Sequence, residues 1–495
     1  MSETIQSHQT NGSRQGATER PAPPRDSTRQ DTVIKVLAGE RFTPYTLARK
    51  LGAVALLESS SYQKGRERYS LLMLREAFRV HQERSGVVVE LDGKRYQVKS
   101  QAHRDILDVL LYFANQHTAP GQNFPFPAGG IGYLSYEFAR YCDTIRFDDK
   151  QDELDMPDAS FLFGHVFLVF DHYTDLLYLI GINYNEHAVD LEAAVSEAEA
   201  RINDMDFNYL RSTDEAYPAT VHSSEAEREQ YLAGVEAIRD EIEKGNLLQG
   251  VLSRRIHVRT ELPALEAYRR LRTANPSPYL FYLDLGTHQL FGSSPEMHIK
   301  VHDGEVRIRP IAGTRKRGED KERDQALEQE LLGDPKERAE HLMLVDLARN
   351  DIGRVCAPGS VHLEEYMGIE RYSHVMHIVS EARGTLAEGQ SGADAIRATF
   401  PAGTVSGAPK IRAIETIQGL EPVPRRFYAG LVGYMEPGGN LDTCITIRSA
   451  MKRDTLLVLQ AGAGVVHDSV PEREYEETEN KLAALMRAAG LEDSA

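Results

Sequence analysis

Short β-rich runs alternate with helical stretches along most of this chain, and this alternation constrains the fold more than any other feature. Residues 86–91 and 161–170 are apolar runs of strand length, whereas residues 106–115 carry apolar side chains at helical spacing. The same alternation fills residues 32–208 without any detectable repeat. The sequence therefore predicts an α+β protein.

The C-terminal half contains clearer individual elements. Ser224 and Glu227 form a capping-box pair at the start of a helix that ends near Lys244. Further predicted elements follow: strands at residues 247–258, 443–449 and 455–460, a glycine-punctuated hairpin at 428–441, and a terminal helix from about residue 471.

The chain divides into a polar tail and two larger regions. Residues 1–31 contain almost no apolar side chain after Ile5, which predicts a disordered tail rather than a targeting sequence. A polar run at residues 209–222 interrupts the apolar pattern and predicts a linker. We therefore expect an N-terminal region over residues 32–220 and a C-terminal region over residues 221–495.

Charge and cysteine content exclude several classes of function. The 57 Lys and Arg residues are outnumbered by 75 Asp and Glu residues, and the resulting net charge of −18 repels phosphate backbones and anionic lipid. No run reaches the ~18 apolar residues that a membrane helix needs. The three cysteines, Cys142, Cys356 and Cys444, lie far apart without CxxC spacing, which favours a reducing compartment. We expect a cytoplasmic protein that binds neither nucleic acid nor membrane.

Two predicted helices begin with carboxylates on one face. Asp334 is a good N-cap for a helix on which Glu337 and Glu340 lie three residues apart, and the terminal helix repeats the spacing with Glu474 and Glu477. Four carboxylates suit one hard cation such as Mg²⁺. Acidic residues also favour helix N-termini because they oppose the macrodipole, and this is the more frequent cause of such a pattern.

Other residues suit a carboxylate ligand. Residues 461–464 read Ala-Gly-Ala-Gly after an apolar strand, so their NH groups could approach an anion, although such a glycine pair is more often only a turn. Arg448 lies in a predicted strand of Thr, Ile and Cys, and a half-buried Arg needs a carboxylate-like partner. Residues 403–410 lack the spacing of a phosphate loop, so nucleotide binding is not expected. A lone histidine such as His377 is more often structural than catalytic.

Taken in order, these segments resemble the anthranilate synthase component I family of chorismate-utilising enzymes. The resemblance covers almost everything after residue 32 and implies an α/β sandwich of two large antiparallel sheets flanked by helices. It rests on these motifs: LLES (56–59), NPSPY (275–279), SSPE (293–296), PIAGTR (310–315), EHLMLVDLARND (340–351), PAGTVSGAPK (401–410), TIRSA (446–450) and AGAGVV (461–466).

The resemblance also implies the site residues. Magnesium would be bound directly by Glu340 and Glu477, with Glu337 and Glu474 acting through water. The residues that would hold chorismate are Gly313, Thr314, Tyr428, Arg448, Gly462, Ala463 and Gly464. Those implied in catalysis are Glu296 as general acid, His377 in pyruvate elimination, Gln249 and Thr404.

The implied reaction adds ammonia to C2 of chorismate while hydroxide leaves C4, and loss of pyruvate from aminodeoxyisochorismate then gives anthranilate. This is the first committed step of tryptophan biosynthesis. Gln249 stands where isochorismate synthases carry a Lys base, and Ala312 stands where related aminodeoxychorismate synthases carry a nucleophilic Lys. Both differences favour ammonia as the nucleophile. No cysteine has a glutaminase-like context, so a separate glutamine amidotransferase subunit is expected in a hetero-oligomer.

A regulatory site is implied as well. The residues that match the tryptophan feedback site of the family are Ser59, Glu58, Pro278, Tyr279 and Leu280, although residues of these types more often serve ordinary strand and turn packing. Two other functions remain open: an aminodeoxyisochorismate synthase that does not eliminate pyruvate, and a non-catalytic sensor of chorismate or tryptophan.

Overall fold

The computed structural model describes residues 5–7, 31–60, 68–99, 103–118, 124–208, 216–222, 224–371 and 375–491. The predicted disordered tail, apart from its residues 5–7 and 31, and residues 209–215 of the predicted linker lie outside the described residues. The helices are α1 (Pro44–Leu51), α2 (Ile106–Ala114), α3 (Leu191–Asn203), α4 (Glu225–Glu243), α5 (Ala264–Ala274), α6 (Lys321–Gly333), α7 (Pro335–Gly353), α8 (Gly392–Thr399), α9 (Lys410–Leu420) and α10 (Pro471–Ala488), with short 3-10 turns η1 (Tyr136–Tyr141), η2 (Gly403–Val405) and η3 (Pro437–Gly439).

The strands of the N-terminal half are β1 (Ile5–Ser7), β2 (Thr32–Ala38), β3 (Ala55–Glu58), β4 (Tyr69–Glu83), β5 (Gly86–Leu91), β6 (Lys94–Val98), β7 (Ile131–Leu134), β8 (Ala159–Asp171), β9 (Leu176–Ile182) and β10 (Ala219–His222). Those that follow are β11 (Gln249–Thr260), β12 (Tyr279–Asp284), β13 (Gln289–Ser294), β14 (Met297–His302), β15 (Glu305–Ile308), β16 (Ile311–Lys316), β17 (His362–Arg371), β18 (Val375–Thr385), β19 (Gly407–Ala408), β20 (Leu431–Met435), β21 (Leu441–Ile445), β22 (Ser449–Arg453) and β23 (Leu456–Val465).

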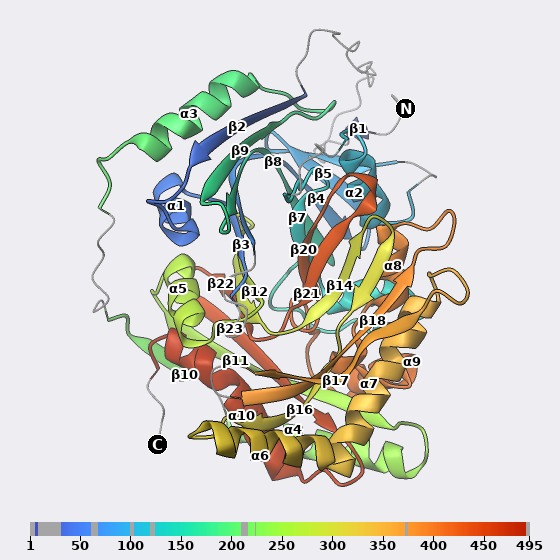
Figure 1. Ribbon diagram of the computed structural model, residues 1–495. Helices are drawn as coiled ribbons and strands as arrows, with labels where there is room; N and C mark the ends of the chain where they lie inside the picture. Colours follow the sequence, from blue (N-terminus) through green and yellow to red (C-terminus); the bar gives the residue numbers. More distant parts are fainter. Residues whose placement is uncertain are drawn as a thin grey trace.

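The long strand β8 divides the sheet structure into two arms. One edge of β8 pairs with β4, and its other edge pairs first with β7 and then with β9, always antiparallel. From β4 the first arm continues through β3, β12, β13, β22, β23, β11 and β10. From β7 the second arm continues through β20, β21, β14, β15 and β18, and β18 also pairs with β16 and β17. The predicted sandwich of two antiparallel sheets is therefore confirmed (Figure 1).

The two expected regions contribute strands to both arms. In the first arm β3 pairs with β12, and in the second β7 pairs with β20, so in each arm a strand from residues 32–220 is hydrogen-bonded to a strand from residues 221–495. The end of the predicted linker is itself a strand, because β10 pairs with β11 over residues 219–222. The two regions thus share one hydrogen-bonded framework.

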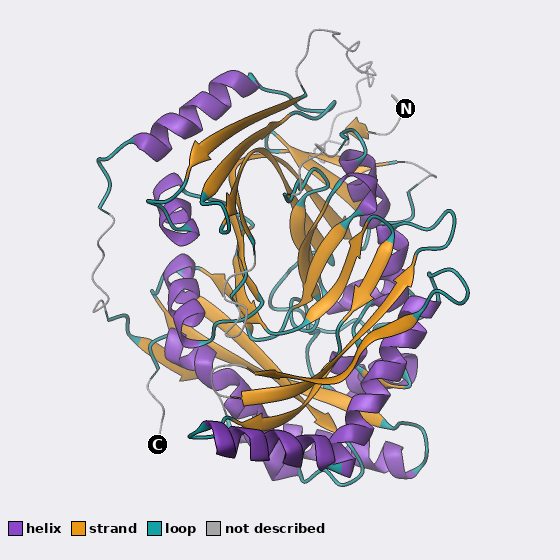
Figure 2. Ribbon diagram, in the orientation of Figure 1, coloured by secondary structure: helices purple, strands orange, loops and turns teal. Residues whose placement is uncertain are grey.

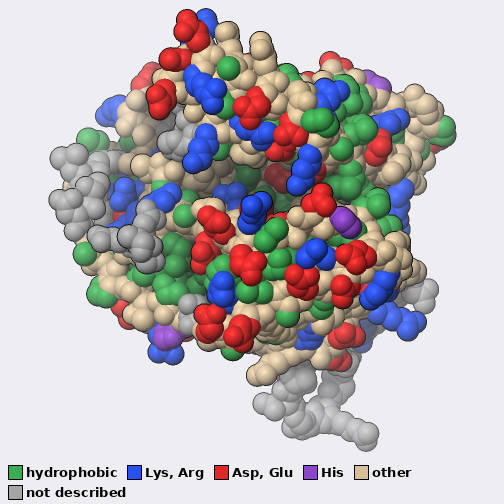
Figure 3. Space-filling view, turned by 90° about the horizontal axis from the view of Figure 1, so that it is seen from below, with side chains coloured by type: hydrophobic (Ala, Val, Ile, Leu, Met, Phe, Trp, Pro, Cys, Tyr) green, Lys and Arg blue, Asp and Glu red, His purple; other side chains and the backbone are tan. Residues whose placement is uncertain are grey.

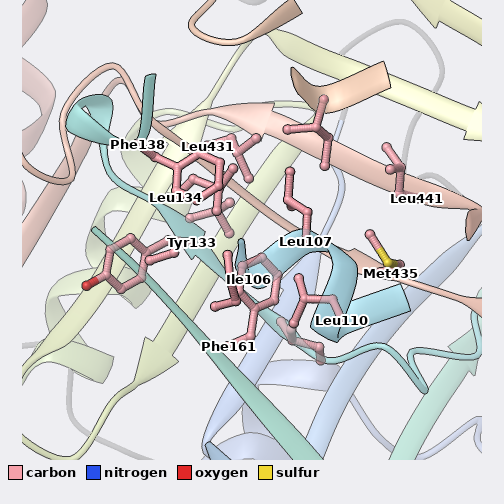
Figure 4. Packing of buried hydrophobic residues seen from close by; sticks show 14 of the residues in the cluster. Ile106, Leu107, Leu110, Tyr133, Leu134, Phe138, Phe161, Leu431, Met435 and Leu441 are labelled. Atoms are coloured by element: carbon pink, nitrogen blue, oxygen red, sulfur yellow. The ribbon is translucent and has the colours of Figure 1, made fainter. Parts of the chain in front are cut away.

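Helices cover the outer faces of the strands (Figure 2). The helices α5 and α10 pack on the first arm, α7 packs on β16 and β18, and α2 packs on β4 and β20. Figure 4 shows Ile106, Leu107 and Leu110 of α2 packed among Phe161 and Met435, all of which are buried. Close packing of this kind removes apolar surface from water and supplies most of the stability.

Among the described residues, the helices are too short or too polar to span a lipid bilayer.

The predicted helix starts are confirmed for α4 and α7. Ser224 and Glu227 form the reciprocal capping box, and the Asp334 carboxylate accepts hydrogen bonds from the backbone NH groups of Lys336 and Glu337. Helix α10 begins at Pro471 as predicted, but its N-cap is Val470, which offers no side-chain cap.

One strand prediction was wrong near the cavity described below. The predicted strand 443–449 is interrupted after Ile445, because Arg448 has a φ of 50° and this left-handed conformation ends the ladder. Conversely, residues 461–464 are not a turn. They continue β23 and pair with β11, where Gly462 lies opposite Ser253 and Gly464 opposite Val251.

Candidate active site

A cavity of about 440 Å³ lies between the two arms, with β11 and β23 on one side and β16 and β18 on the other. Helices α7 and α10 complete its wall. The structure brings most of the sequence-predicted residues into this lining: Gln249, Glu296, Gly313, Thr314, Glu340, His377, Thr404, Tyr428, Arg448, Gly462, Gly464, Glu474 and Glu477. Two predicted residues do not line it: Ala463 is buried in β23, and Glu337 lies just beyond Gly313.

Glu296 lies between β13 and β14 and is held there by its backbone. Its NH group donates to the Ser294 hydroxyl at 3.3 Å, and its carbonyl accepts from the Ile445 NH group at 3.0 Å. Burial raises the pKa of the Glu296 carboxyl to about 7, while the Thr404 hydroxyl and Lys481 act in the opposite direction. A carboxylic acid that is partly protonated at neutral pH can serve as a general acid.

His377 reaches the cavity opposite a bulge in β16. The β16–β18 register shifts between Ala312 and Thr314, and Gly313 occupies the bulge with a φ of 68°. The Gly313 carbonyl accepts a hydrogen bond from Nδ1 of His377 at 3.0 Å, so Nδ1 carries the proton of the neutral ring and Nε2 is the basic nitrogen. Burial lowers the pKa of His377, which favours this neutral form.

Arg448 provides positive charge at the cavity wall. Its guanidinium makes no hydrogen bond or ion pair with the residues that the structure describes. Burial lowers the pKa of Arg448, while Tyr428 and Glu477 oppose that shift. A half-buried cation without a protein partner favours binding of an anion.

The two glycines of β23 allow polar side chains to approach its backbone. A Cβ atom at Gly464 would lie 2.5 Å from Nε2 of Gln249, and one at Gly462 would lie 2.9 Å from the Tyr428 hydroxyl. The Oε1 atom of Gln249 is buried and accepts no hydrogen bond in the described structure. A hydrogen-bond donor in the cavity would satisfy this oxygen.

Three of the predicted metal ligands, Glu340, Glu474 and Glu477, line the wall of this cavity. Burial raises the pKa of Glu340, and the charges of Glu337 and Glu477 raise it further. Burial likewise raises the pKa of Glu474, and the charge of Glu477 adds to this shift. Glu337 is instead ion-paired with Arg315, whose Nη1 lies 2.8 Å from Oε1. The described residues contain no group of three His, Cys, Asp or Glu side chains close enough to hold a metal ion as they stand.

Sequence reasoning missed Lys481 of α10. Its Nζ lies 2.6 Å from Oε1 of Glu477 and donates to the Gly462 carbonyl at 2.8 Å. The i, i+4 spacing from Glu477 is a signal that could have identified this pair. Lys336 and Arg473 also line the cavity, and Figure 3 shows acidic and basic side chains interspersed over a hollowed face of the molecule.

A second cavity, of about 390 Å³, contains all five residues predicted for the regulatory site: Glu58, Ser59, Pro278, Tyr279 and Leu280. They meet because β3 and β12 pair, with Leu280 opposite Glu58.

The polar groups of this second cavity differ in their bonding. The Ser59 hydroxyl is buried without a hydrogen-bond partner among the described residues. The Glu58 carboxylate, in contrast, accepts from the Tyr268 hydroxyl at 2.6 Å and from Arg272 at 3.0 Å. Pro295 and Ile311 line both cavities, so the two sites share a wall.

Comparison with known proteins identifies the family of the chain. The family model for chorismate binding enzymes matches residues 69–487. The chain is 62% identical to anthranilate synthase component 1 of Spirochaeta aurantia over 464 residues, which cover 93% of this chain and 96% of that protein. It is 42% identical to the protein of the same name from Methanothermobacter thermautotrophicus over 443 residues, covering 88% of this chain and 89% of the relative.

Solved structures show a similar fold. The crystal structure of anthranilate synthase component I from Streptococcus pneumoniae superposes with a TM-score of 0.76 at 34% identity, covering 85% of this chain and 92% of that chain. The menaquinone-specific isochorismate synthase MenF from Escherichia coli has the same fold, with a TM-score of 0.70 at 19% identity over 93% of this chain and 96% of that chain. The chain therefore belongs to the anthranilate synthase component I family of chorismate-binding enzymes.

Proposed function

We propose that the chain converts chorismate and ammonia to anthranilate and pyruvate by way of aminodeoxyisochorismate. The observation that carries this proposal is that the buried acid Glu296 and the unpartnered cation Arg448 face one cavity. Chorismate carries two carboxylates and a hydroxyl group that leaves only when protonated. A guanidinium and a protonated carboxyl in one cavity match both requirements.

In the first step, nitrogen forms a bond to C2 of the ring while the bond from C4 to oxygen breaks. Glu296 gives its proton to the departing hydroxyl group, which leaves as water. Gln249 supports ammonia as the nucleophile, because its buried Oε1 can accept an N–H group, and an amide side chain is too weak a base to activate water.

In the second step, the proton on C2 is removed and the bond from C3 to the enolpyruvyl oxygen breaks, which gives an aromatic ring. The leaving group departs as enolpyruvate and becomes pyruvate when its methylene carbon takes up a proton. Neutral His377 can accept a proton at Nε2 because its Nδ1–H is committed to the Gly313 carbonyl. This residue separates the proposed activity from that of an enzyme that stops at aminodeoxyisochorismate.

The carboxylates of α7 and α10 fit a magnesium ion by their chemistry. The raised pKa values of Glu340 and Glu474 arise partly from the negative charges of neighbouring carboxylates, and a divalent cation would relieve this repulsion. Glu340 and Glu477 would bind the ion directly, and Glu337 and Glu474 would act through water. When bound, magnesium would polarise the ring carboxylate of chorismate.

The second cavity is proposed to bind tryptophan as a feedback inhibitor. The unpartnered Ser59 hydroxyl can bond the amino or carboxyl group of an amino acid, and Leu57, Pro278 and Phe281 provide apolar contact. Because Pro295 precedes Glu296 and lines both cavities, an occupant here can act on the neighbouring acid through the backbone.

Ammonia is proposed to come from a partner glutaminase subunit. The relatives are named component 1, which implies a second component. The free cysteines support this view, because burial raises the pKa of Cys142, Cys356 and Cys444 and leaves their thiols poor nucleophiles.

The direct test is to incubate the purified chain with chorismate, Mg²⁺ and either ammonium or glutamine. Anthranilate, recognised by its fluorescence and mass, is expected with ammonium and not with glutamine. Accumulation of aminodeoxyisochorismate would favour the enzyme that does not eliminate pyruvate, and chorismate returned unchanged would favour a sensor.

A further inference from the structure

A buried ion pair lies directly behind the wall of the candidate active site. The Arg425 side chain is 1% exposed, and its guanidinium binds the Glu421 carboxylate through two hydrogen bonds of 2.8 Å and 2.7 Å. Neither residue lines the cavity, so neither contacts a substrate bound there. A buried ion pair contributes little net stability, because the cost of removing both charges from water offsets their attraction. A role other than stability is therefore considered for this pair.

The remaining donors of Arg425 hold two wall segments together. Nη1 donates to the Val405 carbonyl at 2.7 Å, and Nη2 donates to the Val251 carbonyl at 2.5 Å. Val405 follows Thr404 in η2, and Val251 follows Gln249 by two residues in β11. One planar group therefore fixes the spacing between the segments that bring Thr404 and Gln249 into the cavity.

The pair also supports two other cavity residues. The Arg425 guanidinium lies 5.7 Å from the centre of the Tyr428 ring. Glu421 accepts hydrogen bonds from the Ser253 NH group at 2.8 Å and hydroxyl group at 2.7 Å, and that hydroxyl accepts from Gln460 at 2.8 Å. Tyr428 and Gln460 both line the cavity.

We propose that Arg425 is a positioning residue for the reaction, which acts by fixing Thr404, Gln249 and Tyr428 rather than by touching the substrate. This inference rests on the proposed function. It predicts that activity depends on the planar, forked shape of the guanidinium as well as on its positive charge. A lysine ammonium group cannot bridge a carboxylate and two carbonyls in one plane.

The test compares Arg425→Lys with a matched control, Arg397→Lys. Arg397 is also buried and bonds Asp105 at 2.8 Å and 2.7 Å, but it lines neither cavity. Both variants should unfold at lower temperature than the wild type. At saturating chorismate, ammonium and Mg²⁺, Arg425→Lys should lose about 10- to 100-fold in kcat, whereas Arg397→Lys should retain the wild-type kcat.

A second readout follows from Thr404. The Thr404 hydroxyl lowers the pKa of Glu296, so a displacement of Thr404 away from Glu296 should raise that pKa. The pH at which kcat falls on the alkaline side should then be higher in Arg425→Lys than in the wild type. It should be unchanged in Arg397→Lys. Glu421→Gln, which keeps the shape of the pair, should reproduce both effects and serves if Arg425→Lys does not fold. A wild-type kcat and pH profile in these variants, or an equal loss in Arg397→Lys, would overturn the positioning role. Failure of the wild-type chain to form anthranilate would instead overturn the proposed function.

Discussion

Glu296 is stabilised in its neutral form by the same burial that suits it to proton transfer. The pKa of its carboxyl rises from 4.5 to about 7 on folding, so this group favours the folded state below pH 4.5 and loses that contribution as pH rises towards 7. The proposed role of Glu296 as a general acid would therefore carry a stability cost at neutral and alkaline pH.

Replacement of Glu296 by Gln should abolish turnover and stabilise the protein in a pH-dependent way. Relative to wild type, the free energy of unfolding should increase by about 2 to 3 kcal/mol more at pH 8 than at pH 5, because the variant buries no charge. Denaturant unfolding at the two pH values, without magnesium or chorismate, measures the difference. An equal shift at both values would mean that Glu296 titrates normally in the folded protein.

The proposed regulatory site can also be tested at a single residue. Ser59→Leu should fill space beside Pro278 and remove the unpartnered hydroxyl, so tryptophan inhibition should weaken about tenfold or more while kcat without tryptophan stays near wild type. Inhibition curves measured at fixed chorismate concentration provide this comparison. Undiminished inhibition would place the effector elsewhere.

At the level of elements, helix α7 and helix α10 bring acidic side chains to one cavity wall from sequence positions more than a hundred residues apart. The sequence predicted both helix starts because capping and proline signals are local. The sequence alone could not show whether these acidic residues bind a cation or only oppose the helix macrodipole. That distinction depends on whether the two helices lie close together in the fold.

Glu340→Gln tests the cation interpretation. The variant should fold normally but need about 10- to 100-fold more Mg²⁺ for half-maximal turnover, or lose turnover altogether. Glu322→Gln, an exposed change on α6, is the matched control and should behave as wild type. An unchanged magnesium requirement in Glu340→Gln would remove this residue from the proposed metal site.

Strand β23 illustrates where sequence reasoning failed. The glycine pattern at residues 461–464 left open a turn or an anion-binding segment, but these residues form a paired strand. Their glycines serve the packing of Gln249 and Tyr428 rather than a change of chain direction. Such a role depends on side chains far away in the sequence. The prediction also placed Arg448 inside a strand. It failed there because no residue type near Arg448 in the sequence indicates its positive φ.

Gly462→Ala should therefore be costly. The new Cβ atom would lie 2.7 Å from the Leu252 carbonyl oxygen, so we expect a loss of about 1 to 3 kcal/mol in unfolding free energy and weaker chorismate binding. Gly419→Ala is the control, because that helical position has open space and should gain up to about 1 kcal/mol. Equal effects of the two changes on stability and KM would contradict this account.

At the scale of the whole molecule, the two sheet arms bring together motifs that are spread over more than two hundred residues. The motifs themselves could be read from the sequence, and most of their residues line one of two cavities. The sequence could not predict that Pro295 and Ile311 form a wall shared by the two cavities. That wall depends on how β13, β14 and β16 are placed in three dimensions.

The central claim is that this cavity directs nitrogen, and not oxygen, to C2 of chorismate. It is tested most directly by the mass of the product formed from chorismate, Mg²⁺ and ¹⁵N-ammonium in ¹⁸O-water. The account predicts anthranilate that carries ¹⁵N and no ¹⁸O bonded to the ring. A ring hydroxylated with ¹⁸O, or chorismate recovered intact, would contradict it.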